Sequence, residues 1–481
     1  MSANTENLPL GGPASAVGAG GGSVVRGFVE RVKASPVAVR LARGTFWSIG
    51  GAIICKALTL ASSVVLARIL GKAGFGKFGL IIGTVATFQV LANLGLSATA
   101  NKHVAEFRKT DPQRAGRILA LSGLVSVVAG ISLAVGLAVW APQLAAGVLN
   151  APELAGPLRI ASLLIFFSAA GGTLVGALSG FEAFKKIAQI NLTAGVLGFP
   201  VMLAGVFYWG LSGALWAVAF SAALNLLLQV WALRDQAGRA GMCIDFRGCG
   251  REWKVLWGFS LPALLAAMVI TPVQWGCTVL LVNQHDGYAQ MGLYNAAFQW
   301  RTAIMFLPVA LGNMSLSVLA SLHGTREWSR YRKALRYAVA VNLALVAVPA
   351  GLVMIFSPQI MRMYGGAFTS GWPVLLIMVA STLLHAPVSV MNQALASTGR
   401  MWTVLGFNLL YAAVLAGATL LAIHLLAMGL ACAILVAYAA QFTALLAFMR
   451  IVRRRLEGRV EGIEPAAVCD RPVTSRNSNG D

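Results

Sequence analysis

The chain has 481 residues, of which 58% are hydrophobic and 11% are charged, with a net charge of +21 and a mean hydropathy of +0.76. Ordinary soluble domains carry about 25% charged residues. The composition therefore excludes a disordered chain, a secreted disulfide scaffold and most soluble enzymes. Because a membrane-spanning helix needs about 20 mainly apolar residues, the apolar content suffices for about twelve spans.

Apolar stretches recur along the whole chain with short polar segments between them. They predict twelve membrane-spanning helices, at residues 45–67, 78–98, 118–140, 157–178, 187–208, 211–233, 256–282, 290–318, 335–357, 370–393, 402–424 and 427–449. Two pairs of spans are joined by very short turns, at 208–210 and 426–428. Residues 1–22 lack the apolar core of a signal peptide.

The basic residues are distributed unevenly between the two sets of loops. With the N-terminus inside, 30 of the 37 lie in inside segments or tails, whereas the outside loops 141–156, 209–210, 283–289 and 425–426 contain none. This bias predicts that both termini are cytoplasmic. The charge of +21 thus reports orientation in a membrane, and we expect no nucleic-acid partner.

Landmarks of the first half recur about 216 residues later. Residues 76–78 correspond to 292–294 at an offset of 216, and 94–95 correspond to 311–312 at an offset of 217. Pro157 likewise corresponds to Pro373, again offset by 216. A six-span repeat has an even number of spans, so its two copies share one orientation. Carriers built from such parallel repeats hold their substrate between the halves near the midplane.

We therefore expect an all-α polytopic membrane protein made of two six-helix bundles. The expected order is a basic cytoplasmic tail over 1–40, a bundle over 41–233, a cytoplasmic linker over 234–255, a second bundle over 256–450 and a cytoplasmic tail over 451–481. Cys243 and Cys249 lack the second cysteine pair or the histidines of a zinc site, so no metal and no cofactor is predicted. With no P-loop, GxSxG or HExxH motif, no enzyme activity is predicted either.

Seven basic residues do not follow the inside bias. Lys56 and Arg301 lie well inside spans, where an unpaired cation costs about 2.5–3.5 kcal/mol on insertion scales, so they are expected to face a polar cavity unless they snorkel. Arg68, Lys72 and Lys77 form a cationic turn on the outside, and Arg362 resembles them. These four fit either lipid phosphates or a positive mouth for an anionic substrate. The seventh, Arg159, lies near a span end and is expected to snorkel.

No acidic residue lies in a predicted span. An ion-driven drug exporter normally needs an intramembrane carboxylate, so this class is disfavoured, and a phosphate or pyrophosphate suits a positive cavity better. Polar span residues that either line the cavity or tie helices together are Gln89, Asn93, Gln274, Asn295 and Gln299.

Several segments resemble the polysaccharide-biosynthesis flippases, the O-antigen and exopolysaccharide lipid-linked oligosaccharide translocases of the MOP superfamily. The similar segments are 66–80 (LARILGKAGFGKFGL), 93–96 (NLGL), 178–184 (LSGFEAF) and 291–297 (MGLYNAA). The resemblance covers roughly residues 40–450.

The resemblance implies a V-shaped pair of six-helix bundles. It also implies a carrier that moves an undecaprenyl-diphosphate-linked oligosaccharide across the bacterial inner membrane. Membrane lipids, and a polysaccharide polymerase with glycosyltransferases, are the partners it implies. Two alternatives stay open at this point: an ion-coupled multidrug exporter of the same superfamily, and a non-transporting scaffold of glycan assembly.

Overall fold

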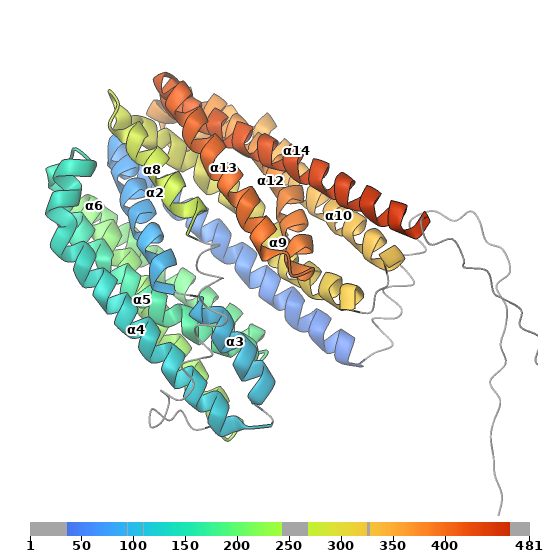
Figure 1. The fold of residues 1–481 in the computed structure, drawn as a ribbon. Helices are drawn as coiled ribbons and strands as arrows, with labels where there is room; N and C mark the ends of the chain where they lie inside the picture. The colour runs from blue at the N-terminus through green and yellow to red at the C-terminus, as the bar shows by residue number, and fades with distance from the viewer. Residues whose placement is uncertain (1–35, 94, 109, 243–267, 325–327, 462–481) are drawn as a thin grey trace, which may run out of the picture.

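A computed structural model describes residues 36–93, 95–108, 110–242, 268–324 and 328–461. Every regular element among them is a helix (Figure 1). The α-helices are α2 (Pro36–Asn93), α3 (Leu96–Phe107), α4 (Pro112–Gln143), α5 (Ala155–Gly180), α6 (Phe184–Arg239), α8 (Ile270–Val282), α9 (Gly287–Gly324), α10 (Trp328–Ile355), α11 (Ser357–Met363), α12 (Trp372–Ser397), α13 (Met401–Ala422) and α14 (Leu426–Glu461). Short helical turns join them at Leu144–Val148 (η1), Pro152–Leu154 (η2), Gly366–Gly371 (η4) and Ile423–Leu425 (η5).

Two of the long helices contain a sharp turn at a glycine. Gly71 interrupts α2 with φ 68° and ψ −179°, and Gly210 interrupts α6 with φ 55° and ψ −131°. Positive φ is readily adopted only by glycine, so each glycine lets one continuous helical stretch supply two spans. The tight turns predicted at 208–210 and 426–428 are confirmed. Gly210 lies in the first of them, and Leu426, which has a positive φ of 55° although it is not a glycine, lies in the second.

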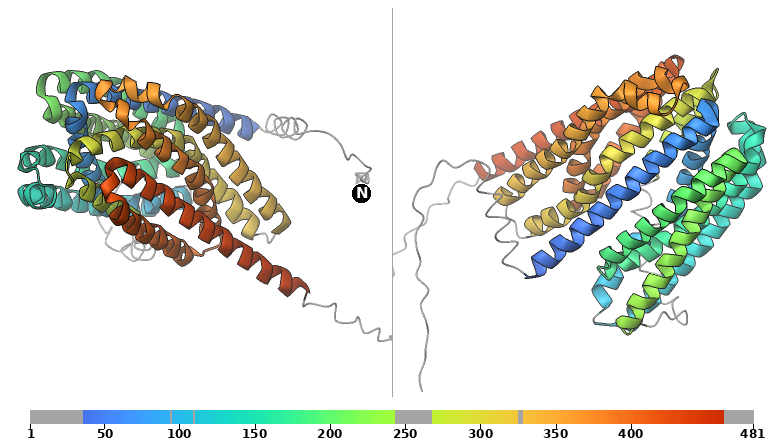
Figure 2. Two further views of the ribbon diagram at one scale, coloured as in Figure 1. Left: turned by 90° about the horizontal axis from the view of Figure 1, so that it is seen from above. Right: turned by 180° about the vertical axis from the view of Figure 1, so that it is seen from behind.

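The helices form two groups that converge at one end and diverge at the other (Figures 1 and 2). The N-terminal group contains α2 to α6 and the C-terminal group contains α8 to α14. Helix α2 lies between them and packs against both α6 and α9. This arrangement agrees with the predicted all-α fold of two bundles.

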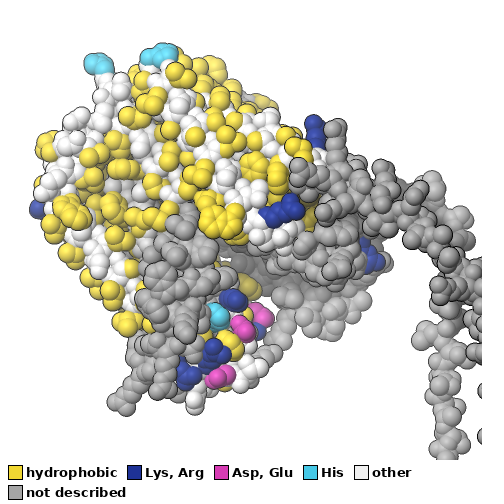
Figure 3. All heavy atoms as spheres, viewed as in Figure 1, with side chains coloured by type: hydrophobic (Ala, Val, Ile, Leu, Met, Phe, Trp, Pro, Cys, Tyr) yellow, Lys and Arg dark blue, Asp and Glu magenta, His cyan; other side chains and the backbone are white. Residues whose placement is uncertain are grey.

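The helices have the length and composition of membrane spans. In the part of the chain that the structure describes, seven helical stretches are long and apolar enough to cross a membrane, among them Ile53–Asn93, Phe184–Arg239 and Met401–Ile451, each of which contains one of the sharp turns. Figure 3 shows hydrophobic side chains over most of the visible face, whereas charged side chains of both signs gather at its lower end.

Some predictions fall outside the described residues. These are the N-terminal tail up to residue 35, the end of the predicted linker with Cys243 and Cys249, most of the first half of the span at 256–282, and the C-terminal tail from residue 462. Within the described ranges, no cluster of three or more metal-ligating side chains is found.

Candidate functional site

The loops of the two groups meet at the end where the groups converge. The Tyr288 hydroxyl donates to the Leu149 carbonyl at 2.6 Å, and Asn283 Nδ2 donates to the Val148 carbonyl at 3.0 Å. Asn150 Nδ2 in turn donates to Asn283 Oδ1 at 2.8 Å. We call this the closed end and the opposite one the open end.

At the closed end α2 and α9 approach so closely that side chains do not fit between them. A Cβ at Gly76 would overlap the backbone carbonyl of Tyr288, and a Cβ at Gly292 would overlap the carbonyl of Lys72. Lys72, one of the predicted cations, is half-buried in this contact. Such glycine-mediated approach is the usual means by which membrane helices gain packing contact.

The other predicted outer cations also lie at the closed end. Exposed Arg68 donates from Nε to the Met363 carbonyl at 2.6 Å and so links α2 to the end of α11. Lys77 Nζ lies 3.0 Å from the Glu153 carboxylate, and Arg362 is exposed beside this region. Arg68 thus bridges the two groups, whereas the Lys77–Glu153 pair braces α2 against η2 of the same group.

The Lys77–Glu153 ion pair predicts a pH dependence. Backbone hydrogen bonding at Glu153, together with the Lys77 ammonium, lowers the pKa of its carboxyl below the ordinary value of about 4.3. The pair therefore contributes fully above that ordinary value and is lost as pH falls through the lowered pKa. We expect the closed end to loosen slightly below about pH 4. Spin-label distances between η2 and the second segment of α2 measure this change, and Glu153→Gln should abolish its pH dependence.

The N-terminal group contains a cavity of about 710 Å³, within the range of roughly 300–1,000 Å³ typical of small-molecule sites. Both segments of α2 line it, together with α3, α5 and α6. No charged side chain is among its described lining residues. Its polar lining consists of hydroxyls and five amides: Gln89, Asn93, Asn191, Asn225 and Gln229.

The cavity extends from the middle of the bundle toward the open end. Helix α5 starts at the closed end, and its lining residues fall between 164 and 175. In α6 they fall between 191 and 202 and between 218 and 229, on either side of the turn at Gly210. That turn lies at the closed end, because the nearest atom to a Cβ at Gly210 would belong to Leu70.

Lys56 lies at the midpoint between the two ends, on the border of the two groups. It precedes Gly71 by 15 residues, and Thr302 follows Gly287 by the same number, which corresponds to about 22 Å of helix. The Lys56 ammonium donates to Thr302 Oγ1 of α9 at 3.3 Å. Cys55 and Thr59 on the neighbouring face of α2 line the cavity.

Arg301 lies inside the C-terminal group and is 5% exposed. Its guanidinium donates from Nη2 to the Tyr438 hydroxyl at 2.8 Å and lies 3.4 Å from His385 Nδ1. It also lies over the rings of Tyr438 and Phe298, in cation–π contacts of 5.2 and 5.9 Å. Arg301 is therefore held by aromatic groups and is not among the residues that line the N-terminal cavity.

The predicted polar residues divide between the cavity and helix contacts. Gln89 and Asn93 line the cavity, and Gln89 also donates to the Leu164 carbonyl. Elsewhere, Gln274 donates to the Tyr411 hydroxyl, and Asn295 donates to the Phe75 carbonyl across the two groups. The contact of Gln299 is made by its backbone carbonyl, which accepts from Thr302 of the same helix.

Sequence reasoning missed the other amides of the cavity, Asn191, Asn225 and Gln229. A usable signal was present, since Asn225 and Gln229 are spaced i and i+4 on one face of an apolar span.

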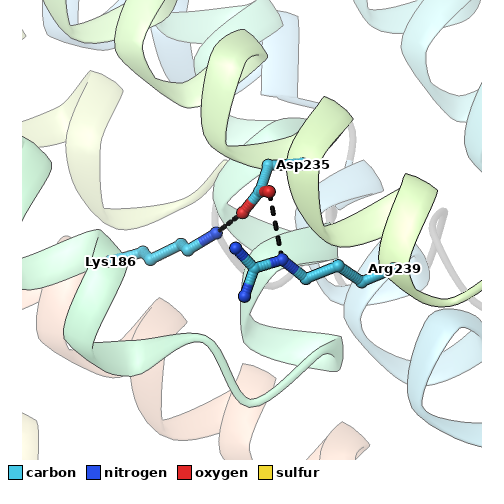
Figure 4. Close-up of polar contacts among 3 residues, drawn as sticks. All are labelled: Lys186, Asp235 and Arg239. Atoms are coloured by element: carbon cyan, nitrogen blue, oxygen red, sulfur yellow. Dashed lines mark hydrogen bonds and ion pairs between the residues drawn. The ribbon is translucent and has the colours of Figure 1, made fainter.

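Charged side chains at the open end pair with one another. Because α6 doubles back at Gly210, Lys186 of its first turn meets Asp235 near its last, and Asp235 also accepts from Arg239 at 3.0 Å (Figure 4). The Lys186 hydrogen bond, with smaller Coulombic contributions, lowers the pKa of Asp235. Lys186 and Arg239 thus make structural contacts that tie the two ends of α6 together.

Residues 41–319 match the family described as "Polysaccharide biosynthesis protein". The chain belongs to that family. It is 26% identical over 393 residues to the EPS I polysaccharide export inner membrane protein EpsE of Ralstonia nicotianae, covering 78% of this chain and 86% of that protein. It is 25% identical over 383 residues to the succinoglycan biosynthesis transport protein ExoT of Rhizobium meliloti, covering 78% and 73%.

Solved structures identify the fold. A multidrug resistance MATE family transporter of the MOP superfamily, in its inward-facing conformation, matches with a TM-score of 0.67 at 15% identity, covering 83% of this chain and 96% of that one. The protein is thus a multi-pass membrane protein of this polysaccharide-biosynthesis family, with the fold of the MOP-superfamily transporters.

Proposed function

We propose that the protein moves an undecaprenyl-diphosphate-linked oligosaccharide from the cytoplasmic to the outer leaflet of the bacterial inner membrane by alternating access. The observation that carries this proposal is the pairing of an uncharged polar cavity toward the open end with a sealed closed end. One state of an alternating carrier must have this asymmetry.

In this proposal the open end faces the cytoplasm and both termini are cytoplasmic, in accordance with the basic loops. The bundles comprise residues 41–233 and 256–450, and residues 234–255 link them. Polysaccharide polymerase and glycosyltransferases are the proposed neighbours in the pathway, because a flipped oligosaccharide must be assembled on one side and polymerised on the other.

The cations act on the diphosphate at different points of its passage. Lys56 neutralises the diphosphate at the midpoint of the seam between the groups. Arg68, Lys72, Lys77 and Arg362 attract or release it at the closed end when that end opens. Arg301 supplies positive potential from within the C-terminal group without contacting the sugar. The lipid tail remains in the bilayer.

Reconstitution tests the function directly. Vesicles containing the purified chain receive an undecaprenyl-diphosphate-linked oligosaccharide labelled on its sugar, and dithionite quenches only the label exposed outside. Protein-dependent translocation is the expected result. A scaffold would give the rate of protein-free vesicles. An ion-coupled drug exporter would instead expel a lipophilic cation such as tetraphenylphosphonium and leave the labelled lipid in place.

A further inference from the structure

The amides of the cavity form a directed chain of hydrogen bonds. Asn225 Nδ2 donates to Asn191 Oδ1 at 3.3 Å, and Gln229 Nε2 donates to Asn225 Oδ1. Gln229 is 7% exposed, and its Oε1 has no hydrogen-bond partner among the described residues. A buried acceptor without a partner is costly, so the chain ends in an oxygen that needs a donor.

Further polar groups in the cavity are free to bind a ligand. Within the described part of the chain, these side chains make no hydrogen bond: Ser62, Asn93, Ser97, Ser168 and Ser221. Each offers both a donor and an acceptor. The aromatic side chains of Phe167 and Phe199 also line the cavity and offer apolar surface. This combination matches a sugar ring, which has hydroxyls at its edge and C–H bonds on its faces.

The same lining disfavours charged and purely apolar ligands. A uronic-acid carboxylate would lose its hydration and find no cation, because Lys56 projects from α2 toward Thr302 and is not among the lining residues. An apolar molecule would leave Gln229 Oε1 and the free hydroxyls without partners.

We propose that this cavity is a recognition site for uncharged sugar residues and that Gln229 is a specificity-determining residue within it. The proposal rests on the proposed function, which it deepens: the sugar is recognised in the N-terminal cavity, apart from the cation at the seam. The required donor at Gln229 Oε1 is a sugar hydroxyl or acetamido N–H.

Binding of soluble sugars tests the site without the lipid. The full chain in nanodiscs is titrated with maltotetraose and chitotetraose, which are neutral, and with tetragalacturonate, which is acidic. We expect a neutral tetrasaccharide to bind at least tenfold more tightly than the acidic one. Gln229→Leu should weaken that binding about tenfold. Gln441→Leu is the matched control, because Gln441 is a buried amide in α14 that bonds to Asn408 and lies outside the cavity.

A second variant tests the site even if Gln229→Leu does not fold. Ser97→Ala combined with Ser168→Ala removes two hydroxyls that make no internal hydrogen bond, so folding should be unaffected while neutral-sugar binding weakens. Equal binding of both kinds of sugar, binding of neither, or equal losses in Gln229→Leu and Gln441→Leu would overturn the site. Sugar binding without lipid translocation would overturn the proposed function alone. Translocation that does not depend on Gln229 would overturn the site alone.

Discussion

Gly76→Ala is expected to open the closed end. The added methyl group would overlap the Tyr288 carbonyl, so α2 and α9 must move apart where they now touch. Overpacking of this kind typically costs about 1–3 kcal/mol, which shifts the equilibrium toward the opened state by about tenfold or more. Transport should fall, because a carrier that cannot reseal one end loses half of its cycle.

A cysteine introduced at position 63 reports this opening. The native Ser63 is 5% exposed, and its hydroxyl is hydrogen-bonded to the Tyr364 hydroxyl of the other group at 3.2 Å. In a background without the six native cysteines, an impermeant maleimide should label Ser63→Cys faster when Gly76→Ala is present. Gly83→Ala is the control, because a Cβ there meets nothing within 4 Å on the same helix. Equal labelling of the two variants would show that the glycine contact does not hold the end shut.

Much of the fold could be predicted from the sequence because membrane burial depends on simple patterns. Runs of apolar residues required helices, and the shortest turns had to fall where glycine or a polar break allowed them. Gly210 confirms this, since it adopts positive φ where the pattern left room for only a few residues, whereas the second short turn places its positive φ at Leu426, which is neither a glycine nor polar. Gly71 was different, because its turn lies within the cationic segment that the sequence predicted as a loop.

The site could be predicted only in part, because the position of a residue along a span does not show which neighbouring helix its side chain faces. Lys56 and Arg301 look alike in sequence, as single cations in apolar runs. Their surroundings differ because α2 lies between the two groups, whereas the relevant face of α9 points into the C-terminal group, toward Tyr438. The amides of α6 were missed for the same reason, since the cavity depends on how α6 folds back onto α2 and α5.

Helix α2 presents one face to the cavity and another to the C-terminal group. Its residues Cys55 and Thr59 face the cavity, whereas Lys56 and Ser63 face the C-terminal group. A rotation of this one helix would move sugar-binding and phosphate-binding groups together. A lipid-linked oligosaccharide carries both chemistries within one molecule, so a helix that bears both faces suits that substrate.

Lys56→Ala is expected to reduce translocation of the labelled lipid-linked oligosaccharide to the rate of protein-free vesicles while leaving the fold intact. The only hydrogen bond of the ammonium in the described structure is to Thr302, and no carboxylate is left unpaired by its removal. A bare cation at mid-membrane costs about 2.5–3.5 kcal/mol, so truncation should not lower the melting temperature. Lys56→Arg keeps the charge and should retain most of the activity.

Arg301→Ala is the comparison for Lys56→Ala, because it removes the charged member of a buried hydrogen-bonded network. Tyr438 and His385 would each lose a contact with the guanidinium, and hydrogen bonds to charged groups contribute about 1.5–3 kcal/mol. We therefore expect Arg301→Ala to lower the melting temperature and the yield of folded protein, and Lys56→Ala to do neither. Normal translocation by Lys56→Ala would remove the lysine from the phosphate path. A stable but inactive Arg301→Ala would transfer that role to Arg301.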